Sequence, residues 1–220
     1  MFTLKVSEEV CTACPDYTGA AIYATVKNSL HNDGLWEKID AIAADYKATH
    51  QIDEVKKNPH ILATRNAYKK FGKDPNRYRP SAEALCRRIL RNLPLYRIDT
   101  LVDLINLVSI RTGYSIGGFD AGKISGDILV LGVGKADEPF EGIGRGMLNI
   151  EGLPVYRDAI GGIGTPTSDN ERTKLSVETT QLFAIINGYS GKEGLKEAVA
   201  YMQSLLREFA ESDGGEVIYY

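Results

Sequence analysis

The residue pattern changes character near the middle of the chain, and this change limits the folds open to it. Residues 33–113 contain long segments in which apolar residues recur three and four positions apart, the spacing of an amphipathic helix. Beyond them, short apolar and β-branched runs alternate with glycine-rich turns, and most of the 22 glycines of the chain lie there. The sequence contains no internal repeat and no linker, so the pattern predicts one α+β domain that spans residues 1–220.

The same pattern locates the expected elements. We expect helices over residues 33–50, 58–72, 80–92, 100–113 and 191–210, with Asp33, Ser81 and Thr100 as the N-caps of the first, third and fourth. We expect strands over residues 3–10, 19–28, 126–134, 153–158, 181–187 and 216–220. The glycine- and threonine-rich residues 158–174 are expected to form a loop.

Composition and cysteine content exclude several classes of protein. The 220 residues are 43% hydrophobic and 25% charged, which is typical of a globular chain rather than of a disordered or coiled-coil one. No apolar run reaches about 18 residues, and the N-terminus shows no signal-peptide pattern. Three cysteines cannot form a disulfide framework. We therefore expect a soluble, cytoplasmic protein with no membrane partner.

The net charge of −3 conceals a strongly basic segment. Residues 56–97 contain twelve Lys or Arg and two acids, a charge of +10, whereas the rest of the chain carries −13. Such a segment is a candidate surface for a polyanion, although acids folded beside it could equally offset its charge. On the expected helix over residues 80–92, apolar residues form one stripe, and Arg87, Arg88 and Arg91 project mainly from the other side.

Motifs for common cofactors and catalytic mechanisms are absent from the sequence. The glycine runs match neither a phosphate-binding loop nor a dinucleotide-binding turn, and residues 142–146 fit a hairpin connection better. No serine-hydrolase or zinc-protease motif occurs, and none of the three histidines has a setting that suggests a catalytic triad. Cys11 and Cys14 form a CxxC pair without further ligands, so we expect no metal and no cofactor. Any chemistry must use carboxylates, hydroxyls, backbone amides or the substrate itself.

Residues 165–173 form the densest polar cluster of the chain. Hydroxyls, an amide, two carboxylates and a guanidinium follow the glycine-rich turn at residues 161–164. Such a loop can recognise a small polar ligand and position a water molecule. It can also be a turn that caps itself, with Arg172 paired to Asp169 or Glu171.

Residues 102–130 contain a helix with a D-x-x-N-x-V pattern, then a glycine, then an FD pair followed by a lysine and a glycine before a strand. These features are Asp103, Asn106, Val108, Gly113, Phe119, Asp120, Lys123 and Gly126. In this order and spacing they resemble the editing domain of the beta subunit of phenylalanyl-tRNA synthetase. Residues 79–85 and 154–174 are similar to free-standing relatives of that domain, so the resemblance covers about residues 60–188.

The resemblance implies both a fold and an activity. The fold is a mixed sheet or sandwich core of unusual topology flanked by helices. Its core spans about residues 60–188, and residues 1–55 and 191–210 pack on it. The activity is hydrolysis of mischarged aminoacyl-tRNA, with the wrong amino acid and the terminal adenosine of the tRNA in one pocket. The implied partner is tRNA and not DNA, and the oligomeric state stays open.

Carried over by position, the resemblance also assigns roles to individual residues. The implied catalytic residues are Asn106, Glu171 and Asp169, of which Glu171 is the better match to the carboxylate that senses a substrate hydroxyl. The implied substrate-binding residues are Gly117, Gly118, Phe119, Gly162, Thr165, Ser168 and Arg172. The implied tRNA-binding residues are Arg79, Arg87, Arg88 and Arg91. We expect the backbone amides of Gly117, Gly118 and Gly162 to stabilise a developing oxyanion.

Two positions depart from the synthetase pattern. Ile105 stands where the synthetase has a threonine, and Gly117 stands where it has a histidine. Three hypotheses therefore remain open. The leading one is an aminoacyl-tRNA editing hydrolase, the second is a tRNA- or RNA-binding module without catalysis, and the third is a protein that binds a small molecule such as an amino acid. The basic segment favours the first two, and the two departures favour the second over the first.

Overall fold

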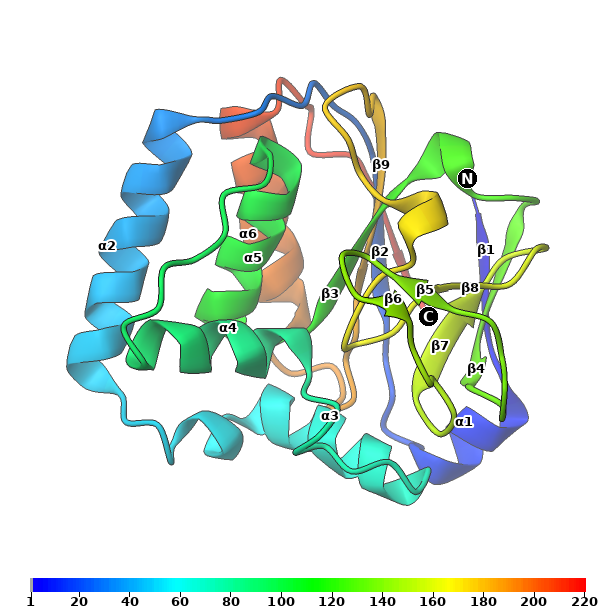
Figure 1. Ribbon diagram of the computed structural model, residues 1–220. Coiled ribbons are helices and arrows are strands. Elements are labelled where there is room, and N and C mark those ends of the chain that lie inside the picture. The colour runs from blue at the N-terminus through cyan, green and yellow to red at the C-terminus, as the bar shows by residue number, and fades with distance from the viewer. Residues whose placement is uncertain (1) are drawn as a thin grey trace.

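Within residues 2–220, which the computed structural model describes, the chain folds into two four-stranded β-sheets and a layer of helices (Figure 1). The central sheet has the strand order β10–β2–β9–β3 and is antiparallel throughout. The second sheet has the order β1–β4–β7–β8, in which β1 runs parallel to β4 and the other pairs are antiparallel. The α+β fold predicted from the sequence is therefore confirmed.

The bounds of the elements are as follows. The central sheet consists of β2 (Ala20–Thr25), β3 (Ile116–Asp120), β9 (Gln181–Ile186) and β10 (Glu216–Tyr219). The second sheet consists of β1 (Thr3–Val6), β4 (Ile128–Val133), β7 (Pro154–Arg157) and β8 (Gly162–Gly164), and a short hairpin is formed by β5 (Glu141–Gly142) and β6 (Gly146–Met147). The helices are α1 (Glu8–Ala13), α2 (Asp33–Thr49), α3 (Pro59–Lys70), α4 (Ser81–Leu90), α5 (Thr100–Thr112) and α6 (Leu195–Phe209).

The central sheet is buried on both faces, which explains why β9 is apolar at almost every position. Leu182, Ala184 and Ile186 face the core beneath α2, α5 and α6. Phe183 and Ile185 face the opposite way, into the core between the two sheets. Because successive side chains of a strand point to opposite faces, a strand with two buried faces needs an unbroken apolar run.

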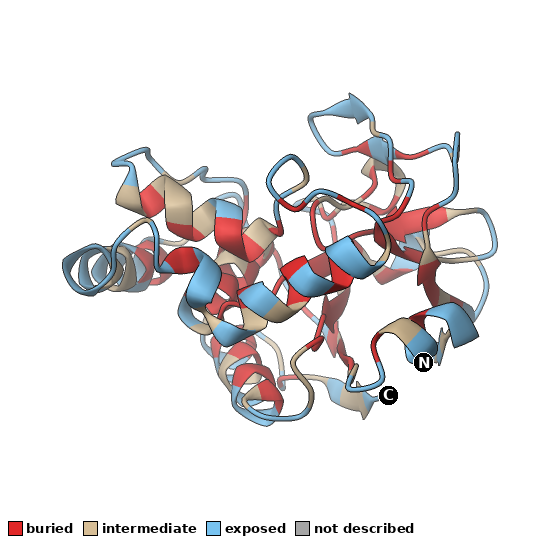
Figure 2. Cartoon of the chain, turned by 90° about the horizontal axis from the view of Figure 1, so that it is seen from below, coloured by how far each residue is buried: buried red, intermediate tan, exposed pale blue. Residues whose placement is uncertain are grey.

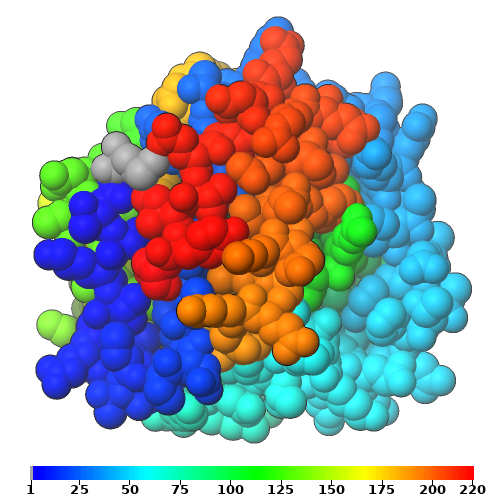
Figure 3. All heavy atoms as spheres, turned by 180° about the vertical axis from the view of Figure 1, so that it is seen from behind, coloured from blue at the N-terminus to red at the C-terminus, as the bar shows by residue number. Residues whose placement is uncertain are grey.

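Segments from the two ends of the chain lie side by side in the central sheet. β10 pairs with β2, with Glu216 opposite Tyr23 and Tyr219 opposite Ala20. In Figure 3, which views the molecule from behind, the C-terminal segment (red) lies against the N-terminal segment (blue), and α6 (orange) lies beside it. The strand expected over residues 216–220 is therefore present, and the helix expected over 191–210 begins at Leu195.

Capping moves several of the expected boundaries. In three helices the N-cap lies one residue earlier than the sequence pattern predicted, at Asn32 for α2, Pro80 for α4 and Asp99 for α5. The strand expected over residues 3–10 ends at Val6, because Ser7 caps the short helix α1. The loop expected over residues 158–174 contains β8 and the 3-10 helix η3 (Glu171–Thr173).

Burial follows these layers. Figure 2 shows buried residues along the strands and the inner faces of the helices, with exposed residues on the outer faces and the connecting segments.

No helix among residues 2–220 is both long enough and apolar enough to cross a membrane.

A buried ionic cluster holds α3 and α4 together. Glu83 of α4 is fully buried, and its two carboxylate oxygens accept hydrogen bonds from Arg65 Nη1 and Arg87 Nε, each at 2.7 Å. Arg65 also donates to the backbone oxygen of Pro75 (3.1 Å) and to the side chain of Asn76 (2.8 Å). Two of the twelve cations of the basic segment are thus offset inside the protein by one of its two acids.

We predict that Glu83→Gln destabilises the protein by about 3–5 kcal/mol, because it leaves the buried Arg65 and the partly buried Arg87 without a counter-charge. Urea denaturation followed by circular dichroism measures the change in the free energy of unfolding. Glu208→Gln is the matched control, since Glu208 pairs with Lys38 on the surface (3.2 Å) and such pairs contribute about 0–1 kcal/mol. Equal effects of the two substitutions would show that the buried cluster does not hold the helices together.

Candidate functional site

A pocket of about 400 Å³ lies at the outer edge of β3, between α5 and the loop that follows β8. Its lining combines many apolar side chains with a few polar ones, which is typical of a small-molecule site. We name it the Asp169 pocket. The lining residues are Ser81, Ile98, Val102, Ile105, Asn106, Ile116, Gly118, Ile143, Thr165, Ser168, Asp169, Lys174 and Leu175.

Gly118 allows α5 to lie close against β3 at this pocket. A Cβ atom at position 118 would lie 2.5 Å from Ile105 Cδ1 and 3.1 Å from Leu175 Cδ1. The ends of α5 are set locally, by the side chain of Asp99 at its N-terminus and by Gly113 at its C-terminus, with a φ angle of 84°. Glycine adopts this left-handed conformation without steric cost, so the helix ends before β3 begins.

The loop after β8 is a turn that caps itself. Thr165 Oγ1 accepts hydrogen bonds from the backbone N–H groups of Thr167 (3.2 Å) and Ser168 (3.1 Å). The backbone N–H of Ser81 in α4 donates to the backbone oxygen of Pro166 (2.8 Å), which joins the loop to α4. The self-capping turn that the sequence left open is therefore present, and Thr165 and Ser168 line the pocket as well.

Asp169 supplies the carboxyl group of the pocket. Its Oδ2 accepts a hydrogen bond from the backbone N–H of Gly118 (3.0 Å). Its Oδ1 fits against Gly117 and Gly164, where a Cβ atom would lie 3.2 Å and 2.8 Å from it. Within residues 2–220, no basic side chain forms an ion pair with it. Burial therefore raises the pKa of Asp169 to about 7, so that this group can accept or donate a proton near neutral pH.

Asn106 lies where the Asp169 pocket meets a second hollow, and it lines both. Within residues 2–220, the side chains of α5 and its N-cap that form hydrogen bonds are those of Asp99, Thr100, Asp103 and Thr112. The amide of Asn106 is not among them, so it is free within the described residues. A polar side chain in an apolar helix, facing a cavity with its amide free, is suited to contact a ligand.

Two residues assigned to the site by the resemblance make other contacts. Glu171, expected as the better match to the sensing carboxylate, forms an ion pair with Lys174 and does not line the pocket. Arg172 makes two hydrogen bonds of 2.9 Å to the buried carboxylate of Asp158. It therefore pairs with neither Asp169 nor Glu171, contrary to the sequence-based alternative, because Asp158 at the end of β7 lies closer in space.

Three further residues lie behind the pocket rather than in it. Phe119 is buried in the core between the sheets, and its ring covers Gly117, where a Cβ atom would lie 2.7 Å from Phe119 Cζ. Gly162 packs against Phe140, with a Cβ atom at position 162 only 2.9 Å from the ring. Of the three backbone amides expected to stabilise an oxyanion, that of Gly118 borders the pocket, and it donates to Asp169.

The second hollow, of about 410 Å³, adjoins the Asp169 pocket and shares Ser81, Ile98 and Asn106 with it. Among the described residues its lining includes no acid. We name it the basic groove. It is lined by five arginines, Arg79, Arg87, Arg88, Arg91 and Arg145. The structure thus brings all four arginines with an implied tRNA-binding role into one hollow.

Arg87 does not lie on an exposed helix face, as the sequence pattern predicted. Its side chain is 16% exposed and is paired with the buried Glu83, which offsets much of its charge. The other four arginines of the groove form no ion pair within residues 2–220. The uncompensated charge of the groove therefore comes from Arg79, Arg88, Arg91 and Arg145.

The β5–β6 hairpin contributes one residue to each hollow that the sequence pattern did not indicate. Its turn, expected only as a connection, places Ile143 in the Asp169 pocket and Arg145 in the basic groove. The backbone N–H of Ile143 donates to the backbone oxygen of Asp169 (3.1 Å), which holds the hairpin beside the loop. A single arginine among glycines does not indicate an RNA-binding role in the sequence, because Arg145 reaches the groove only when the hairpin folds back.

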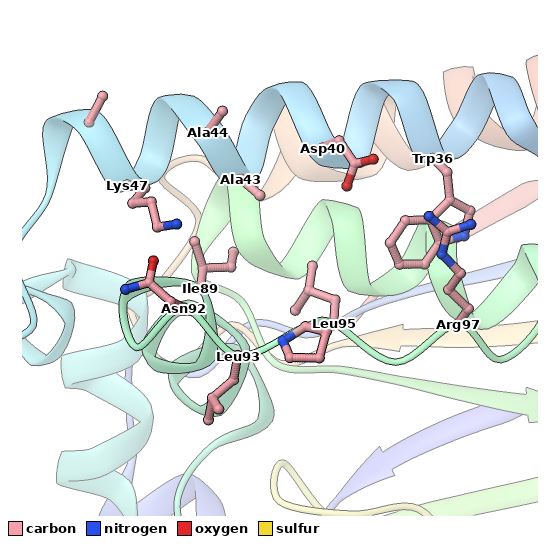
Figure 4. Close-up of a pocket in the computed structure, with 12 residues that line it drawn as sticks. Trp36, Asp40, Ala43, Ala44, Lys47, Ile89, Asn92, Leu93, Leu95 and Arg97 are labelled. Carbon is pink, nitrogen blue, oxygen red and sulfur yellow. The ribbon is translucent and has the colours of Figure 1, made fainter.

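A third hollow, of about 700 Å³, lies between α2 and residues 92–97 (Figure 4). Arg97 lies over the ring of Trp36 at one end of it, 4.3 Å from the ring centroid. This hollow contains none of the residues to which the resemblance assigns a role. No group of three or more His, Cys, Asp or Glu side chains that could hold a metal ion occurs within residues 2–220.

The pKa of Asp169 predicts a pH-dependent effect of Asp169→Asn on stability. The folded chain holds the proton of this group more tightly than the unfolded chain, in which its pKa has the ordinary value near 3.8. The wild-type protein therefore loses stability as the pH rises from about 4 to about 7, and the substitution removes this loss because an amide does not ionise. Thermal unfolding should show a larger gain in Tm for the variant at pH 8 than at pH 5. Equal shifts at the two pH values would contradict the raised pKa.

Comparison with known proteins identifies the family of the chain. Residues 63–210, more than half of the chain, match the B3/4 domain family. No curated protein matches the chain. Among solved structures, the chain is similar to an N-terminal fragment of the phenylalanyl-tRNA synthetase beta-subunit from Pyrococcus horikoshii, with a TM-score of 0.48 and 16% sequence identity over 98% of this chain. The chain spans 50% of that fragment. On the family match, the chain belongs to the B3/4 domain family.

Proposed function

We propose that this protein hydrolyses the ester bond of an aminoacyl-tRNA. The observation that carries the proposal is the junction of two hollows at Asn106, one with a carboxyl group that titrates near pH 7 and the other lined by arginines. An aminoacyl-tRNA has matching parts, because a small activated ester terminates a polyanion. Membership of the B3/4 family and the sequence resemblance to the synthetase editing domain support a tRNA-related role.

Asp169 is the group that would activate water. Its ionised carboxylate accepts a proton from a water molecule as the water oxygen attacks the carbonyl carbon of the ester. The bond from this carbon to the ribose oxygen then breaks, and the proton passes to the ribose oxygen. The products are a free amino acid and a tRNA with a free terminal hydroxyl. A side-chain nucleophile is unnecessary, because an aminoacyl ester is already activated.

Asn106 is the group that would stabilise the developing negative charge on the carbonyl oxygen. Its amide has no hydrogen-bond partner among the described residues, and it lies at the boundary between the pocket for the amino acid and the groove for the RNA. The hydroxyl of Ser168 and the ammonium group of Lys174 line the same pocket. Loss of one such donor typically slows a reaction about a hundredfold or more.

The apolar lining suits an apolar amino acid side chain. Ile98, Val102, Ile105, Ile116, Ile143 and Leu175 surround the pocket. Ile105, which stands in place of the synthetase's threonine, packs on Gly118 and adds to this apolar surface. Within residues 2–220, Asp169 is then the one acid of the lining that can contact a substrate hydroxyl or a water molecule.

A catalytically inactive RNA-binding module is the second candidate. One observation favours it: the backbone N–H of Gly118, expected to stabilise an oxyanion, is already occupied by Asp169. The basic groove would serve this function equally well, and a deacylation assay separates the two candidates. A protein that binds an amino acid without RNA would leave the groove arginines without a role.

The first test is a deacylation screen of the purified protein against tRNAs charged with each amino acid. We expect release of at least one amino acid at a rate that rises with pH and levels off above about pH 7, because the base must be ionised. Asp169→Asn should lower this rate by about a hundredfold or more. Glu171→Gln is the matched control and should retain activity, since Glu171 lies two residues away but outside the pocket lining. Full activity of Asp169→Asn would exclude Asp169 as the base.

The second test concerns the basic groove. Arg91→Glu should weaken tRNA binding and make the dependence of log Kd on log salt concentration shallower, because Arg91 is exposed in the groove and unpaired among the described residues. Lys57→Glu is the control, since this exposed residue carries the same charge in the same basic segment but does not line the groove. Filter binding at several salt concentrations measures both. If Lys57→Glu weakens binding as much as Arg91→Glu, the groove is not the tRNA site.

A further inference from the structure

Residues 92–98 form a wall between the basic groove and the hollow of Figure 4, and this wall exposes large apolar side chains. Leu93 is 47% exposed, Tyr96 64% and Ile98 52%. All three line the basic groove. Exposed apolar groups among unpaired arginines are unfavourable in water, and a ligand that is both apolar and anionic would cover them.

Tyr96 is held in a stack on one of these arginines. The guanidinium of Arg88 lies 4.0 Å from the centroid of the Tyr96 ring. Arg88 Nε also donates a hydrogen bond to the backbone oxygen of Pro94, which fixes the guanidinium against the wall. The ring is therefore oriented on one face by Arg88, and its high exposure leaves other surface of the ring open to solvent.

We propose that Tyr96 and Arg88 form a stacking site for an unpaired nucleobase of the RNA strand that enters the basic groove. This inference rests on the proposed function and specifies the part of the substrate that the groove binds. Aromatic rings and guanidinium planes stack with bases of any sequence, whereas bases inside a duplex are covered by their neighbours. Arg79, Arg91 and Arg145 would neutralise the adjoining phosphates.

The position of the stacking site agrees with the direction in which the substrate must lie. The basic groove joins the Asp169 pocket through Ser81, Ile98 and Asn106, which line both. A strand whose base stacks on Tyr96 can therefore continue past Asn106 and present its terminal ester to Asp169. The substrate class is an aminoacyl ester at the end of a single-stranded segment.

The test compares binding of two fluorescein-labelled RNAs, a single-stranded hexanucleotide and a blunt-ended duplex, by fluorescence anisotropy. Tyr96→Ala should weaken binding of the hexanucleotide about tenfold or more, while its affinity for the duplex stays unchanged. Tyr96→Phe and Tyr96→Trp should bind the hexanucleotide as the wild type does or more tightly, because they keep an aromatic ring. Tyr219→Ala is the control, since Tyr219 is 45% exposed on β10 and does not line the groove.

Two results would overturn the stacking site. One is wild-type affinity of Tyr96→Ala for the hexanucleotide, and the other is an equal loss for the hexanucleotide and the duplex.

Asp169→Asn separates this inference from the proposed function, because it should bind the hexanucleotide normally but fail to release amino acids. Tyr96-dependent binding by a wild-type protein that deacylates no charged tRNA would exclude the hydrolase and retain the stacking site. Deacylation by a Tyr96→Ala variant that binds the hexanucleotide as tightly as the wild type would retain the hydrolase and exclude the stacking site.

Discussion

Both faces of the central sheet are buried, and this burial limits where a polar site can form in the protein. The helices α2, α5 and α6 cover one face and the second sheet covers the other, so the inner strands must be apolar on both sides. Leu182 and Phe183, neighbours in β9, enter different cores. A polar site cannot form in the middle of such a sheet, because each unpaired polar group there would lose its hydration. The site must lie at an edge.

The site lies at β3, the edge strand of the central sheet, and the two glycines of this strand make the site possible. Gly118 lets Ile105 of α5 pack directly on the strand, and its N–H, which no strand partner occupies, faces the loop after β8. Gly117 and Gly164 leave space for the carboxyl group of Asp169 to reach that N–H. The same close packing removes most water from Asp169 and raises its pKa to about 7. The close packing that these glycines allow therefore explains both the position of the site at the edge of β3 and the raised pKa of Asp169.

The basic groove depends on how the chain distributes its few acids. Glu83 is directed inwards, where it joins α3 to α4 through Arg65 and Arg87. Its burial removes an acid from the surface of the basic segment. Among the described residues no acid lines the groove beside Arg88 and Arg91, so the surface of the groove is strongly positive. The buried cluster of Glu83, Arg65 and Arg87 therefore joins the two helices and leaves the remaining positive charge of the groove without an acidic partner among the described residues.

Hydrophobic periodicity, the glycine at position 113 and the apolar run of β9 are local properties, so the class of fold and most elements could be predicted from the sequence. The sequence also indicated Asn106 and the loop after β8 as parts of a site. Which carboxylate of that loop faces the pocket depends on tertiary contacts. Asp169 and Glu171 are two residues apart, and the self-capped turn directs the first to Gly118 and the second to Lys174. Likewise, Arg145 lines the groove because the β5–β6 hairpin folds back onto it, and Glu83 is buried because Arg65 of α3 packs against it. Both depend on contacts between segments that are distant in the sequence, and no local sequence pattern predicts such contacts.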